Sequence, residues 1–124
     1  MKNRTELFTI ITLIFFIVIP FTIIDFIVHS FIIYAVPFNY FTYEILFGIL
    51  YGVIIYLLLQ KVKNIYLKSF LFSIILATAL QVNYYILGYS KFVVEFFFIH
   101  GFILFIVSII MFIDTNLSEN KQDQ

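Results

Sequence analysis

Four long apolar segments, separated by short polar ones, follow one another along the 124-residue chain. Their approximate limits are residues 7–28, 43–59, 65–88 and 92–113. Because an α-helix rises about 1.5 Å per residue, roughly 20 residues cross the ~30 Å hydrocarbon core of a bilayer. The pattern therefore predicts an all-α integral membrane protein. Its single domain is a bundle of four transmembrane helices, followed by a polar tail at residues 114–124.

Three places break the regularity of this pattern. Pro20 lies inside the first segment and is expected to kink the helix, because it removes one backbone hydrogen bond. Residues 29–42 stay apolar but contain Pro37 and Asn39, so they are compatible with helix, loop or a segment in the headgroup plane. The polar residues after Ile113 are expected to be disordered.

Composition narrows the class of protein further. Hydrophobic residues make up 64% of the chain and charged residues only 11%, whereas about a quarter of a soluble domain is charged. We therefore expect the lipid bilayer to be the main partner of the chain. The formal net charge is zero, which gives no reason to expect a nucleic-acid partner. The absence of cysteine excludes disulfides and Cys-ligated metal sites.

The basic residues predict an orientation. In a four-span arrangement six of the seven fall on one side and only Lys91 falls on the other. The six are Lys2, Arg4, Lys61, Lys63, Lys68 and Lys121. Since cytoplasmic loops carry the excess of Lys and Arg, both termini and the basic link at residues 60–68 are expected in the cytoplasm. The expected location is the plasma membrane of a prokaryote.

Small residues recur at helical spacing and indicate faces where helices pack closely. Gly48 and Gly52 form a GxxxG pair in the second segment. Ser69, Ser73 and Ala77 follow one another at intervals of four in the third. On the fourth, the small residue expected at a packing face is Gly101.

The ionisable residues within or at the edge of the apolar segments all lie away from the cytoplasmic side. They are Asp25, His29, Glu44, Glu95 and His100. A charge inside the bilayer costs at least about 2.5 kcal/mol on insertion scales, so such residues usually face a partner or water. Two histidines and several carboxylates are also the ligand types of zinc, iron, manganese and copper.

One hypothesis is therefore a metal site that draws on Asp25, His29, Glu95 and His100. Asp25 and His29 are four residues apart and share a helix face, whereas Glu95 and His100 are five apart and do not share one well. The sequence contains no HExxH or Glu-x-x-His motif. This leaves open that each group is satisfied separately by a hydrogen bond or by headgroup water.

Two further hypotheses use the same residues. Bis-histidine haem could lie between His29 and His100, but their expected depths match only if the first helix is strongly tilted or extended. A proton or solute path could run through the bundle, but the cytoplasmic half offers no ionisable residue. No catalytic motif is present, and the sequence predicts no particular cofactor.

The functional hypothesis that composition favours is a small accessory subunit, which packs laterally against the subunits of a larger membrane protein complex. Four helices with almost no loops leave few residues for a function that the chain could carry out alone. Under this hypothesis Glu95 and His100 would pair with each other, with Gln81 or Asn83, or with a partner. The alternative is a bundle with an outward-facing polar site that binds a metal ion or haem.

Overall fold

The computed structural model describes residues 2–31, 37–88 and 94–122, and side-chain surroundings for residues 4–30, 37–88, 95 and 97–115. Within these ranges the chain forms four α-helices. They are α1 (Lys2–Phe31), α2 (Phe38–Leu58), α3 (Ile65–Ile86) and α4 (Val94–Gln122). All four are long and apolar enough to cross a membrane. The prediction of an all-α bundle of four such helices is confirmed.

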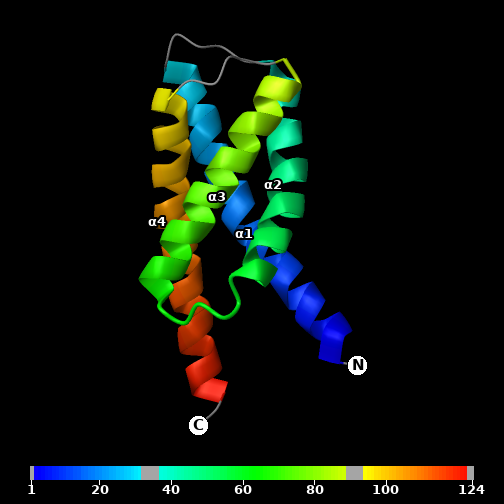
Figure 1. The fold of residues 1–124 in the computed structure, drawn as a ribbon, viewed down its shortest axis with the longest axis vertical. Coiled ribbons are helices and arrows are strands. Elements are labelled where there is room, and N and C mark those ends of the chain that lie inside the picture. The colour runs from blue at the N-terminus through cyan, green and yellow to red at the C-terminus, as the bar shows by residue number, and fades with distance from the viewer. Residues whose placement is uncertain (1, 32–36, 89–93, 123–124) are drawn as a thin grey trace.

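The helices are arranged as a ring. Each one contacts the next along the chain, and α4 returns to contact α1. Figure 1 shows both termini and the α2–α3 link at one end of the bundle, with the end of α1 and the start of α4 at the other. It also shows α1 running obliquely across the bundle rather than upright.

The first and last helices, α1 and α4, are longer than the hydrophobic pattern indicates. α1 begins at Lys2 and ends at Phe31, and it continues through Pro20. α4 continues to Gln122, so the tail that we expected to be disordered is helical up to that residue. No glycine or proline follows Gly101, and nothing in the sequence therefore stops this helix.

The irregular segment at residues 29–42 divides between two helices. Residues 29–31 end α1, and residues 38–42 begin α2 after Pro37. Residues 32–36 lie outside the described residues, as do residues 89–93 of the short link before α4.

The two ends of α3 have clear local causes. Asn64 precedes the helix, and its side-chain oxygen accepts hydrogen bonds from the backbone N–H groups of Tyr66 (3.0 Å) and Leu67 (3.3 Å). After the helix, Gly88 has a φ of 81°, a left-handed conformation that favours glycine and ends the helix.

The small residues lie where helices of this chain meet one another. An ideal Cβ on Gly48 would be 3.0 Å from Val18, and one on Gly52 would be 2.7 Å from the Cγ2 of Ile14, so both glycines press α2 against α1. A Cβ on Gly101 of α4 would be an ordinary 3.9 Å from that of Ala77 on α3. The other two members of the α3 series, Ser69 and Ser73, are also buried.

We expect Gly52→Ala to destabilise the bundle, because the new methyl group would collide with the buried β-branched side chain of Ile14. Overpacking of this kind costs about 1–3 kcal/mol. The matched control is Gly101→Ala, which meets only ordinary contacts and should be neutral or stabilising by up to about 1 kcal/mol. Thermal unfolding of the detergent-solubilised protein, followed by circular dichroism, measures both. Equal melting temperatures for the two variants would contradict the α1–α2 contact.

Candidate metal centre

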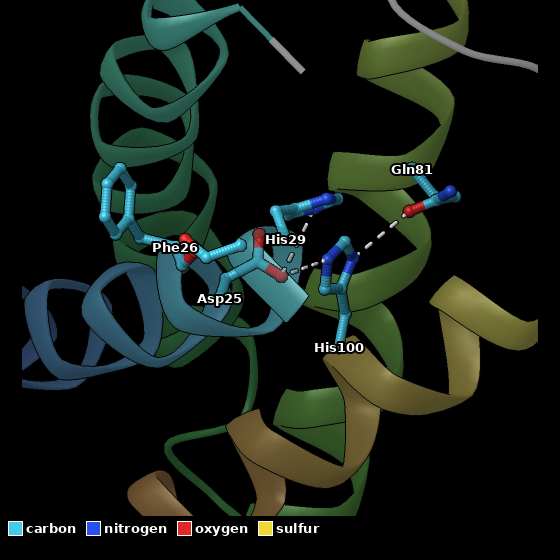
Figure 2. A network of polar contacts seen from close by, with 6 residues as sticks. Asp25, Phe26, His29, Gln81 and His100 are labelled. Atoms are coloured by element: carbon cyan, nitrogen blue, oxygen red, sulfur yellow. Dashed lines mark hydrogen bonds and ion pairs between the residues drawn. The ribbon is translucent and has the colours of Figure 1, made fainter. Parts of the chain in front are cut away.

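Asp25 and His29 lie near the end of α1, which Figure 1 shows at the end of the bundle opposite the termini, and Figure 2 shows their side chains. They are four residues apart, so their side chains stack along the helix. The Nε2 atom of His29 is 3.5 Å from Oδ1 of Asp25, and both residues are buried. The pairing expected from their spacing is therefore present.

His100 reaches the same carboxylate from α4. Its Nε2 atom is 2.9 Å from Oδ1 of Asp25, and its Nδ1 atom is 3.2 Å from Oε1 of Gln81 on α3. Figure 2 shows the His100 ring lying between these two partners, with His29 beside Asp25. The imidazole thus links three helices in one buried polar chain.

The positions of these residues follow from the buried stripe of each helix. His100 begins a series of buried residues at intervals of four that continues through Leu104, Ser108 and Phe112. On α3 the stripe of small residues continues by the same step to Gln81. Each of these polar side chains therefore lies on the core-facing side of its helix, near the end of α1, the end of α3 or the start of α4.

Asp25, His29, Gln81 and His100 form a buried polar cluster. A second buried carboxylate belongs to it. Glu44 of α2 has no exposed surface, and it interacts electrostatically with Asp25 and Tyr84. Neither of its carboxylate oxygens has a partner at hydrogen-bond distance among the described residues, although Asp25 and Tyr84 lie near them. The other oxygen of Asp25, Oδ2, and the hydroxyl of Tyr84 are equally buried and also lack one.

Aromatic rings enclose the cluster. The ring of Phe21 lies edge-on to His100, with centroids 5.6 Å apart, and Tyr40 lies edge-on to His29 at 5.3 Å. Tyr40 also packs against Tyr84 at 4.3 Å. These rings exclude water and lower the local dielectric, which strengthens every charge interaction inside.

The arrangement of donors suits a metal ion. One ligand atom from each of Asp25, His29 and His100 can be chosen so that all three lie within 4.8 Å of one another. Zinc lies about 2.0–2.2 Å from nitrogen and oxygen ligands, so neighbouring ligand atoms in a tetrahedral site are about 3.3–3.6 Å apart. The observed separations of 2.9 and 3.5 Å are close to that spacing.

The remaining contacts of His100 also match those of a metal ligand. Ligating histidines usually donate their second ring N–H to a carbonyl or carboxylate, which orients the ring. An Nδ1–H of His100 that donates to Gln81 leaves the lone pair of Nε2 directed at Asp25. A cation in that place would satisfy the nitrogen and the carboxylate together.

The structure brings together three of the four residues that the sequence suggested for a metal site. Glu95 is exposed on α4, one turn and a half before His100, and it does not belong to the cluster of possible ligands found among the described residues. His29 and His100 do meet, with ring centroids 6.4 Å apart. The sequence analysis allowed this approach only if the first helix was strongly tilted or extended, and α1 does run obliquely (Figure 1) and continues to Phe31.

Haem fits this geometry less well than a single ion. A porphyrin between two axial histidines needs an open planar cleft, whereas Oδ1 of Asp25 lies within 3.5 Å of the Nε2 atoms of both His29 and His100. The space between the imidazoles is therefore taken by a carboxylate. Two imidazole nitrogens around one carboxylate oxygen can share a single cation.

Sequence reasoning counted Glu44 among the possible metal-ligating carboxylates but did not select it for the site, although a signal for its position exists. Glu44, Gly48 and Gly52 are spaced by four residues, so the glycine face that packs on α1 leads directly to Glu44. Gln81 was recognised as a possible partner of His100, and Tyr84 one turn later shares its face.

The basic residues of the α2–α3 link lie at the other end of the bundle. Lys61 and Lys63 are exposed. Lys68 is half-buried, with its ammonium group 4.3 Å from the ring centroid of Tyr56 and 5.4 Å from that of Phe112. These lysines have no part in the polar cluster.

Comparison of the chain with protein-family models, with curated proteins and with solved structures gives no match. Its function is therefore inferred from the site itself.

The contact between Asp25 and His100 can be tested without metal, by a double-mutant cycle measured after chelation. His100→Leu leaves the Asp25 carboxylate without its closest partner and should cost about 3 kcal/mol. Adding Asp25→Asn should restore part of that loss, with a coupling of about 0.5–3 kcal/mol. The control is Glu95→Gln, an exposed position on α4 where the change should stay within about 0.5 kcal/mol. Additive losses in the cycle would contradict the contact.

Proposed function

We propose that this chain is an integral membrane protein that binds one divalent transition-metal ion through Asp25, His29 and His100. The observation that carries the proposal is the convergence of two imidazoles on one carboxylate inside a closed bundle, with the possible ligand atoms within 4.8 Å of one another. Two histidines and a carboxylate are a ligand set of zinc and of non-haem iron.

Burial of the site strengthens this proposal. An ionised carboxylate away from water is costly unless it is paired, and Asp25 is fully buried. No Lys or Arg is among the buried side chains that the structure describes. A cation with charge +2 is the simplest compensation for the acidic groups of the cluster, and imidazole nitrogens favour a transition metal over calcium or magnesium.

Support for a membrane location comes from the outer surface of the helices. Large apolar side chains stay exposed on all four, including Phe16, Leu50, Phe70 and Phe102. In water this surface would aggregate, whereas lipid tails would solvate it. The basic residues support an orientation with both termini and residues 60–68 in the cytoplasm, and a prokaryotic plasma membrane is the setting we propose.

A second candidate function is that of an accessory subunit in a larger membrane complex. It is favoured by an apolar groove of about 570 Å³ between α3 and α4, whose lining includes Ser73, Phe98, Gly101 and Phe102. A small-residue floor between aromatic walls would admit a helix of another membrane protein. The two functions are compatible, because the groove opens on the outside of the bundle and the metal centre lies inside.

The metal proposal predicts about one bound ion per chain after mild detergent extraction at native expression level. Elemental analysis of the purified band, followed by chelation and titration with Zn²⁺, measures stoichiometry and affinity. Asp25→Asn should weaken binding by about 100-fold or more, since even an outer-shell partner of a metal ligand is worth 10–100-fold. Glu95→Gln is the matched control, because it makes the same carboxylate-to-amide change at an exposed position.

A native gel with mass spectrometry of the same extract separates the two candidates. Migration alone with stoichiometric metal supports the metal site without a partner. Migration with larger membrane proteins, no metal in the band and no affinity for Zn²⁺ after chelation would overturn the metal proposal and favour the accessory subunit.

The proposed orientation gives a separate prediction, which is simple to test because the natural chain contains no cysteine. Lys63→Cys lies in the α2–α3 link, and Asn39→Cys lies in the first turn of α2 at the opposite end; both positions are exposed. In intact cells a membrane-impermeant maleimide should label only the Asn39→Cys variant. Lys63→Cys should react once the membrane is permeabilised. The reverse pattern would refute the orientation and leave the metal proposal unaffected.

A further inference from the structure

We infer that Glu44 is the fourth ligand of the metal ion, so that the site is closed by protein on all sides and has a structural rather than a catalytic role. This inference rests on the proposed metal-binding function and adds to it the coordination and the purpose of the site. It concerns a residue that the sequence analysis counted among the possible metal-ligating carboxylates but placed at the edge of the membrane.

The burial of Glu44 is the first observation. The side chain is fully buried, and neither of its oxygens has a partner at hydrogen-bond distance among the described residues, although Asp25 and Tyr84 lie near enough to interact with it. Buried polar groups in native proteins are almost always paired, and an unpaired carboxylate is among the most costly exceptions. A carboxylate in this position therefore calls for a ligand.

Its position within the bundle is the second observation. The Glu44–Gly48–Gly52 face of α2 packs on α1, and the side chain of Glu44 interacts with that of Asp25. Glu44 lies beside Asp25, outside the set of Asp25, His29 and His100 ligand atoms that lie within 4.8 Å of one another. It approaches this set from the one helix that does not otherwise supply a ligand or an orienting group, so coordination would draw its side chain toward the ion.

Charge balance is the third observation. Asp25 and Glu44 together carry two negative charges when ionised, and no buried cationic Lys or Arg faces them in the described part of the chain. A divalent ion with two neutral imidazoles and two carboxylates makes a site with no net charge. Such a site is far less costly in an apolar bundle than either carboxylate alone.

Four protein ligands decide the role of the metal. Catalytic zinc sites keep one position open for water or substrate, whereas structural sites are tetrahedral and fully occupied by protein. With Glu44 as the fourth ligand, α1, α2 and α4 are joined through one ion, and α3 is joined through Gln81. The ion would thus hold the ring of helices together at this end.

The test is Glu44→Gln, an uncharged substitution of the same size, compared with Glu95→Gln as the matched control. Without metal, Glu44→Gln should melt at the same or a higher temperature than the natural protein, because it removes a buried carboxylate next to Asp25. With Zn²⁺ it should lose most of the metal-induced rise in melting temperature, and its affinity should fall by about 100-fold or more. A residue that only packs would not give these opposite effects.

Visible absorption of the Co²⁺-substituted protein reports the coordination directly. The natural protein and Glu95→Gln should show the intense bands of four-coordinate Co²⁺, and Glu44→Gln should show weaker bands from a site opened to water. If Glu44→Gln binds Co²⁺ with unchanged affinity and spectrum, the inference is wrong and the proposed metal site stands with three ligands. If the natural protein binds neither ion, the proposed function itself fails.

Discussion

The contact between the Asp25 carboxylate and the His100 imidazole joins the first helix to the last, and the closed ring depends on it. At 2.9 Å it is shorter than the contacts of His100 with Gln81 (3.2 Å) and of His29 with Asp25 (3.5 Å). A carboxylate in an apolar bundle is tolerated only with a partner, so Asp25 determines which face of α4 must turn inward. Gln81 then orients the imidazole from α3, and His29 adds a second imidazole from α1.

Small residues and polar residues cooperate along the same faces. On α2 the two glycines bring the helix against Ile14 and Val18 of α1, and the same buried face carries Glu44. On α3 the serine and alanine positions face inward and the same stripe ends at Gln81. Close packing along most of each helix therefore brings the polar side chains together near the end of α1 and the start of α4, which Figure 1 shows opposite the termini.

Hydropathy was sufficient to predict the four helices, because each apolar segment is long and the links are short. The spacing of four residues was sufficient to predict that Asp25 and His29 lie side by side, since both belong to one helix. Glu44 could not be assigned in the same way: the sequence placed it at the first turn of its helix, where water is near, whereas α2 begins six residues earlier at Phe38 and carries it into the core. Glu95 was included because periodicity within α4 does not say which of its faces meets α1.

The distribution of the cluster over all four helices has a consequence for biosynthesis. Asp25 and His29 leave the ribosome first, Glu44 and Gln81 follow, and His100 comes last. Until α4 has been synthesised, Asp25 lacks its closest partner, the imidazole of His100, and α1 lacks its contacts with α4. Arrival of His100 completes the cluster, so maturation of this protein is expected to occur in one late step that follows synthesis of the whole chain.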